Sequence, residues 1–236
     1  VIDQFLAFGG NSQATGDRTL AQYFAVLAQS YSSSADRDWL RIFAESLEDE
    51  RRQFFQEYWT SEHSKRLPHV RAVDSLWQGG LRQKLQRFLN NTQQEAGDFV
   101  LALTLGGEGR TVNFSGRQNA VTVTMPESEP LDAFYVFVHE AVSSIVVSAV
   151  TDNTTPADQR AGTTARYITA GTVRAGAMLL QRVAPELVAG YTRYYLMQAG
   201  RPTSDDLNVA LANVFPMPEP IRQAIERQLD VVLGGI

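Results

Sequence analysis

Apolar residues in the first ninety positions recur every three or four residues, which is the spacing of one face of an α-helix. Asp17 can cap the first such segment, whose apolar positions are Leu20, Tyr23, Phe24 and Leu27. Residues 39–58 continue the pattern with several aromatic side chains, and Pro68 separates them from a third segment at residues 72–90. Gly79-Gly80 weakens the middle of the third segment. The pattern therefore predicts three helices, the last of them kinked.

The period then changes from helical spacing to short runs rich in Val, Thr and Phe. These runs cover residues 99–105, 110–114 and 120–125, and the glycine-rich segment 106–109 separates the first two. Short β-branched runs bounded by glycine are typical of strands joined by tight turns. The sequence predicts a three-stranded antiparallel sheet here.

Helical spacing returns after Pro130 and continues to the end of the chain. The expected helices cover residues 131–150, 157–183, 185–199, a short stretch capped by Thr203 or Ser204, and 221–233. The fold class expected is α+β, mostly helical, with one small antiparallel sheet at about residues 99–125. We expect a single domain over residues 1–236, with a helical N-terminal part at 1–95 and a part at 96–236 that holds the sheet and the remaining helices.

The segment 131–150 is the most apolar of the chain. It is long enough to cross a membrane, but His139-Glu140 lies in its middle, and this pair is costly in a bilayer. Apolar residues surround the predicted helix on most sides, as in a helix at the centre of a protein. We therefore expect a buried helix and no transmembrane segment, with these side chains in the core: Val136, Phe137, Ala141, Val142, Ile145 and Val146.

Composition excludes several classes of function. Hydrophobic residues make up 44% of the 236 residues, enough for a sizeable core, and the net charge of −5 disfavours nucleic-acid binding. The absence of cysteine excludes thiol catalysis and cysteine-ligated metals. The chain starts at Val1 without a Met or a basic leader. Either a signal peptide has been removed, which would place the protein in the periplasm or outside the cytoplasm, or the sequence starts late.

One motif carries the residue types of a known chemistry. The central helix contains His139-Glu140-Ala141-Val142-Ser143. In the HExxH motif of zinc peptidases, two imidazoles four residues apart hold one ion, and the glutamate between them acts on the zinc-bound water. The order of elements is three helices, three short strands, an apolar helix with His-Glu, and then further helices. This order resembles that of gluzincin-type zinc metallopeptidases. The resemblance implies that His139 matches the first zinc ligand and Glu140 the general base.

The sequence departs from that family at the remaining ligands. Ser143 stands where the second histidine belongs, and the following helix at 157–183 contains no glutamate, so that the next one is Glu186. A catalytic zinc site needs three protein ligands. Three interpretations remain: a degenerate, metal-free relative with His139, Glu140 and Ser143 as vestiges; an active zinc enzyme with rearranged ligands; and an unrelated fold in which His139 is buried. We expect no bound metal or cofactor. We expect Glu140 to be satisfied by a hydrogen bond or by a nearby cation, with these candidate cations on the following helix: Arg160, Arg166 and Arg174.

Two other features have residue types that can form chemical sites. His63 and His69 flank Pro68 and are six residues apart, but a solvated loop explains them better than a metal site. The glycine-rich segment 106–109 is followed by a predicted strand, so no helix N-terminus would face a phosphate, and a hairpin turn is favoured.

Apolar and aromatic residues in unusual places favour a protein-binding role. Adjacent aromatic pairs extend beyond one helix face, and both chain ends are apolar. The interface candidates are Val1, Ile2, Phe5, Phe54, Phe55, Tyr194, Tyr195, Val232, Leu233 and Ile236. We expect a non-catalytic interaction or structural protein, a peptidase-like scaffold that serves as accessory subunit or assembly factor of a larger complex. Its expected partners are other protein subunits, and its expected position is extrinsic to a membrane. The alternative is a zinc-dependent metallopeptidase with unusual ligands.

Overall fold

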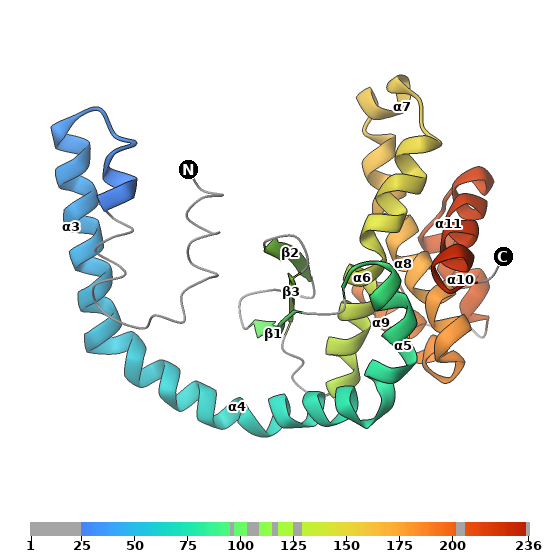
Figure 1. Cartoon of the computed structure of the whole chain (residues 1–236), viewed down its shortest axis with the longest axis horizontal. Helices are drawn as coiled ribbons and strands as arrows, with labels where there is room; N and C mark the ends of the chain where they lie inside the picture. Colours follow the sequence, from blue (N-terminus) through green and yellow to red (C-terminus); the bar gives the residue numbers. More distant parts are fainter. Residues whose placement is uncertain are drawn as a thin grey trace. The chain divides into compact units, whose positions relative to one another are not determined.

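A computed structural model of the chain describes residues 25–94, 97–102, 109–114, 118–124, 129–201 and 206–234. The described part is mostly helical, as predicted (Figure 1). The chain divides into two compact units, residues 1–68 and 69–236. We predicted one domain whose two parts meet near residue 95, whereas these two units meet at residue 68.

The first unit is built from long helical segments. Residues 25–28 are helical, and α3 (Ser34–Glu50) follows after a short turn. The Oγ atom of Ser33 accepts a hydrogen bond from the backbone N–H of Asp36 at 3.4 Å, which satisfies one of the free donors at the helix start. A π-helical segment at Arg51–Phe55 joins α3 to α4 (Gln56–Leu76), which carries the chain into the second unit.

The prediction that Pro68 separates two helices is wrong, because Pro68 lies inside α4. Proline removes one backbone N–H and leaves the carbonyl of the residue four positions earlier without its usual partner. That residue is Ser64, and it is exposed, so water can bind the freed carbonyl. His63 and His69 consequently lie on a helix rather than in a loop.

The predicted kink at the glycine pair is confirmed. A π-helical segment at Trp77–Leu81 follows α4, and Gly80 within it has a φ of 140°. This region of backbone conformation is readily open only to glycine. The kink leads into α5 (Arg82–Asn91), whose Leu85 and Phe88 are fully buried.

Three short strands follow, and their pairing is mixed. They are β1 (Phe99–Ala102), β2 (Arg110–Phe114) and β3 (Gln118–Thr124). β3 pairs antiparallel with β2, with Val112 opposite Ala120, and parallel with β1, with Phe99 opposite Val121. The purely antiparallel arrangement that we predicted is therefore wrong for β1. Strand propensity identifies the strands, but the direction of β1 depends on which edge of the β2–β3 hairpin it meets.

The helix α6 (Pro130–Asp152) lies at the centre of the second unit, as predicted. It packs against α8 (Thr163–Val183), α9 (Val188–Gln198) and α11 (Glu219–Val232), and it also contacts β2 and β3 (Figure 1). All six of its predicted core side chains are buried, with relative exposures of 0 to 7%. By length and composition alone α6 could cross a membrane, but 67% of its most apolar window is buried inside the protein.

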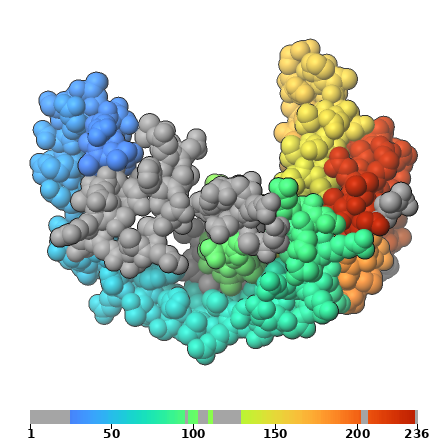
Figure 2. All heavy atoms as spheres, in the orientation of Figure 1, coloured from blue at the N-terminus to red at the C-terminus, as the bar shows by residue number. Residues whose placement is uncertain are grey.

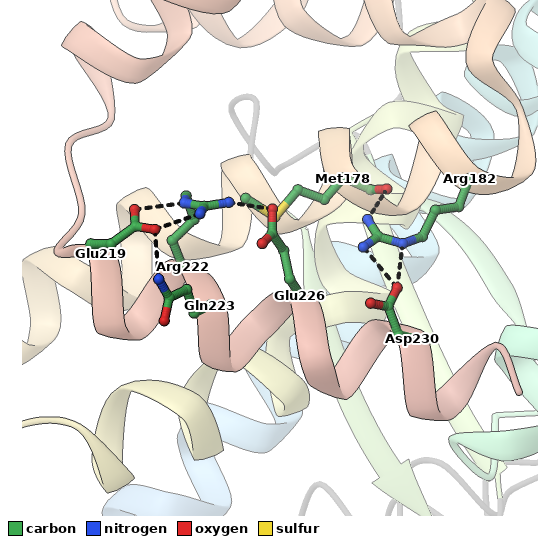
Figure 3. A network of polar contacts seen from close by, with 7 residues as sticks. All are labelled: Met178, Arg182, Glu219, Arg222, Gln223, Glu226 and Asp230. Atoms are coloured by element: carbon green, nitrogen blue, oxygen red, sulfur yellow. Dashed lines mark hydrogen bonds and ion pairs between the residues drawn. The ribbon is translucent and has the colours of Figure 1, made fainter. Parts of the chain in front are cut away.

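Short elements connect these helices, and ion pairs lie along their outer surface. The connecting elements are α7 (Pro156–Arg160), a 3₁₀ turn at Pro185–Leu187 and α10 (Leu207–Val214). Arg182 on α8 donates through Nε to Asp230 on α11 at 2.9 Å and through Nη1 to the carbonyl of Met178 at 3.0 Å (Figure 3). This pair links α8 to α11 beside the buried contacts between them.

Candidate functional site

The central helix borders a cavity of about 560 Å³ that contains the predicted motif. Its walls come from α6, α8 and α9, from Gly109 just before β2, and from Phe215 after α10. The lining residues are Gly109, His139, Glu140, Ser143, Ile168, Thr169, Thr172, Val173, Tyr195, Gln198, Ala199 and Phe215. Cavities of several hundred cubic ångströms with a mostly apolar wall and few polar groups are typical of small-ligand sites.

His139 and Glu140 contact each other in this cavity. The Nδ1 atom of His139 lies 3.1 Å from Oε1 of Glu140, and Oε2 of Glu140 accepts a hydrogen bond from the hydroxyl of Thr111 at 3.3 Å. The two side chains are 24% and 13% exposed. An ionised carboxylate can only accept, so Nδ1 carries the proton, and in a neutral imidazole Nε2 is then an acceptor.

Packing on both sides holds this pair in place. The ring of Tyr195 stacks on the imidazole of His139, with centroids 5.3 Å apart and planes inclined by 22°. On the other side, a Cβ atom at Gly109 would lie 2.5 Å from Cγ of Glu140 and 2.7 Å from Cγ1 of Val136. Only a residue without a side chain allows the backbone to approach the helix this closely.

Buried tyrosines extend from the cavity into the core. Tyr191 is fully buried and Tyr195 is 8% exposed, and burial raises the pKa of both hydroxyls. Burial also raises the pKa of Tyr194 to about 12. All three hydroxyls therefore stay protonated at neutral pH.

The donors around His139 do not fit a catalytic zinc site. Among the described residues, the cavity lining includes one imidazole and one carboxylate, and the carboxylate contacts that same imidazole. Glu186, the next glutamate along the chain, instead pairs with Lys84 of α5. Over the described ranges, no three His, Asp or Glu side chains are grouped so that they could hold a metal ion. A catalytic zinc site needs three protein ligands, and the described residues around His139 do not supply them.

The prediction that Arg160, Arg166 or Arg174 supplies a cation to Glu140 is wrong. Arg166 donates to the hydroxyl of Thr163 at 3.4 Å, and Arg160 is exposed on α7. Arg174 lies near Arg222, Glu219 and Glu226, and burial followed by the charge of Arg222 lowers its pKa. The described partners of Glu140 are instead the hydroxyl of Thr111 on β2 and the imidazole of His139 on α6. No sequence spacing pointed to Thr111, because β2 and α6 meet only in the folded chain.

The interface candidates divide into exposed and buried residues. Phe54 and Phe55 are 60% and 46% exposed. Tyr194 and Tyr195 are buried in the core, so the free aromatic surface that we expected at this pair is wrong. Val232 and Leu233 are partly buried against the same core. The remaining candidates lie outside the described residues: Val1, Ile2, Phe5 and Ile236.

A larger exposed surface occupies the first unit, and we call it the aromatic face. Its members are 44 to 60% exposed: Trp39, Ile42, Phe43, Leu47, Phe54, Phe55, Tyr58 and Trp59. The helical spacing of apolar residues at positions 39–58 predicted the helix that carries most of them. Helical spacing cannot distinguish a face that packs on its own chain from one that stays open.

No protein-family model, curated protein or solved structure matches this chain.

Proposed function

We propose that this chain is a non-catalytic interaction protein that binds another protein subunit through the aromatic face. One observation carries the proposal: eight large apolar side chains within 21 consecutive positions, Trp39 to Trp59, are each at least 44% exposed. Scattered exposed apolar residues are ordinary, whereas a contiguous set is typical of a binding surface.

Ring stacking orders the aromatic face before any partner binds. Trp39 stacks on Phe43 with centroids 5.3 Å apart, and Phe54 stacks on Tyr58 at 5.8 Å. Phe55 and Trp59 form a third stacked pair at 6.0 Å. Side chains that already hold one conformation lose less entropy on binding, and aromatic residues are enriched at the energetic centres of interfaces.

The charges beside the aromatic face favour a protein over a membrane surface. Residues 34–63 contain eight acidic and four arginine side chains, a net charge of −4. Helices that lie on anionic lipid are instead rich in Lys and Arg on their polar side. Several of the charges pair along the helix, including Arg41 with Glu45 at 2.9 Å. Because several of these charges already pair with one another, a partner protein with its own apolar surface would recognise the apolar side chains. Figure 2 shows α3, which carries part of the aromatic face, in blue.

Site-specific photocrosslinking in the native source tests this proposal. A photoreactive phenylalanine at Phe54 should form a cross-link to a defined partner protein, whereas the same group at the neighbouring Gln53 should form much less. The partner is then purified, and its affinity for the wild-type chain is measured. The double variant Trp39→Ser/Phe54→Ser should weaken binding at least tenfold, while Gln53→Ser should change it less than twofold.

Two results would contradict the proposal. Equal cross-linking from positions 53 and 54 would show that the aromatic face has no preferred partner. An unchanged affinity of a correctly folded Trp39→Ser/Phe54→Ser variant would show that the partner binds elsewhere. Circular dichroism of each variant separates loss of binding from loss of fold.

We further propose that this interaction protein is an α+β scaffold with a metallopeptidase-like order of elements, one small sheet and a vestigial His139-Glu140 pair. It would act as an accessory subunit. The alternative, a zinc peptidase with unusual ligands, is tested by metal analysis of the dialysed protein. About one equivalent of retained zinc would favour the enzyme, and retention should then require His139.

A further inference from the structure

We propose that the cavity beside His139 and Glu140 binds a small ligand that carries a primary ammonium group on an apolar body. The described residues that line this cavity all belong to the second unit, whereas the aromatic face belongs to the first.

Among the described residues, the polar part of the cavity presents acceptors and no permanent positive charge. The described lining includes one carboxylate, on Glu140, and no Lys or Arg. Nδ1 of His139 contacts Oε1 of Glu140. An ionised carboxylate can only accept, which assigns the proton to Nδ1, and Nε2 is the acceptor of the neutral ring in that tautomer. Within the described ranges no residue bonds to Nε2 or to the hydroxyl of Ser143, which lies one helical turn from His139. An ammonium group has three N–H donors, and the cavity offers three kinds of acceptor.

The charge of the Glu140 carboxylate also favours a ligand with an ammonium group. The Glu140 side chain is only 13% exposed, and none of the described Lys or Arg residues forms an ion pair with it. A poorly solvated carboxylate is stabilised by a bound cation more than an exposed one is. A ligand that brings its own positive charge therefore gains an interaction that the protein does not already supply. An anionic ligand would be repelled.

The remaining wall fits an apolar body. Tyr195 and Phe215 line the cavity, and an ammonium group close to an aromatic ring is favourable. A second cavity of about 580 Å³ shares Thr169 and Phe215 with the first. Its wall is mostly apolar, with Tyr167, Val214 and Pro216, and Arg166 is its one charged lining residue among those described. The first cavity alone, at about 560 Å³, has room for a side chain of leucine size.

The test uses leucinamide as the probe and N-acetylleucinamide as its neutral control. Calorimetry on the full chain should show saturable binding of leucinamide with a Kd of about 1 mM, and at least tenfold weaker binding of the acetylated control. The chain has three histidines, so the His139 ring signals can be assigned by NMR with a His139→Gln variant. These signals should shift with leucinamide and stay in place with the control.

Variants of Glu140 on α6 and of Glu129, the residue directly before α6, separate charge from fold. Glu140→Gln retains the size of the side chain and removes its charge, and it should weaken leucinamide binding at least tenfold. Glu129→Gln is the matched control, because Glu129 is exposed at the start of the same helix and makes no capping hydrogen bond. It should change the Kd less than twofold.

Leucyl-leucinamide identifies the source of the ammonium group. Tighter binding of this dipeptide amide than of leucinamide would assign the site to the N-terminus of an apolar peptide, and equal binding would assign it to a small free amine. The proposal is overturned by any of three results: no saturable binding of leucinamide, equal affinity for the acetylated control, or unchanged affinity in a folded Glu140→Gln variant. If Glu140→Gln does not fold, the comparison of the two probes on the wild-type protein decides alone.

Discussion

The hydroxyl of Tyr191 on α9 lies directly against Gly176 on α8, so that a Cβ atom at this glycine would overlap it. Tyr191 is fully buried, and its hydroxyl has no hydrogen-bond partner in the described part of the chain. Gly190 and Tyr135 repeat the arrangement between α9 and α6. Glycine on one helix thus lets a large ring from the next one approach the backbone, and this brings α9 close enough to place Tyr195 on His139.

Gly176→Ala should therefore destabilise the protein. A methyl group has no space beside Tyr191, and overpacking of a core typically costs about 1–3 kcal/mol. Urea unfolding followed by circular dichroism measures the effect. Gly79→Ala is the control, because a methyl group there would meet no neighbouring side chain within 4 Å, and it should be neutral or stabilising by up to about 1 kcal/mol. Equal stabilities of the two variants would show that α8 and α9 repack freely.

Phe137→Ala should remove a central packing contact of α6. The ring is 7% exposed and meets Trp77 and Phe99 edge to face, with centroids 5.0 and 5.3 Å apart. Truncation of a buried phenylalanine costs about 3–5 kcal/mol. Val147→Ala on the same helix is 41% exposed and should cost less than about 1 kcal/mol. A loss below about 1 kcal/mol for Phe137→Ala would mean that α6 is not the central helix.

Glu140→Gln and Thr111→Val should each lower the free energy of unfolding by about 1 kcal/mol, because each weakens a partly buried hydrogen bond. The two residues bond to each other at 3.3 Å, so the double variant should lose less than the sum of the single variants. Thermal or urea unfolding of all four proteins gives the coupling. Strict additivity would contradict the bond, and a hydrolytic activity lost in Glu140→Gln would favour the zinc-peptidase alternative.

The start of α11 should show a distinct acid dependence. Arg222 pairs with Glu219 and Glu226, and Gln223 donates to Glu219 at 2.9 Å (Figure 3). Hydrogen bonds from Arg222 and then Gln223 lower the pKa of the Glu219 carboxyl to about 2.

A pKa lowered in the folded state means that the folded protein holds this proton less tightly than the unfolded chain. The contribution is therefore fully present above the ordinary pKa of 4.5 and is lost as the pH falls toward about 2. NMR titration of the Glu219 carboxyl should show the low pKa in the wild type and a value closer to 4.5 in Arg222→Gln. An unchanged titration in this variant would contradict the pairing.

Residues whose environment depends on near neighbours in the chain were predicted well. The all-round apolar character of residues 131–150 was sufficient to predict α6 and its buried side chains, because such a helix is stable only inside a protein or a membrane. Gly80 was sufficient to predict the kink before α5. At the candidate site, His139, Glu140 and Ser143 were found by spacing, since residues one turn apart share a helix face.

Predictions failed where contacts between distant segments decided the outcome. Pro68 remains inside α4 because the surrounding surface is open to water, and water access is not encoded in the proline itself. Tyr195 was expected at a surface, yet it packs on His139, 56 positions earlier in the chain. Thr111 reaches Glu140 because Gly109 lets the strand approach the helix.

The sequence by itself determined the mostly helical character, the burial of α6, the kink at Gly80 and the absence of a second histidine at Ser143. These properties follow from side-chain chemistry and from spacing within a single element. Only the tertiary structure decided the mixed pairing of β1, the partners of Glu140 and the opposite environments of Phe54 and Tyr194. The physical reason is that the same amphipathic spacing stabilises a helix whether its apolar side is covered or open, and the segment that covers it is chosen by packing across the whole chain.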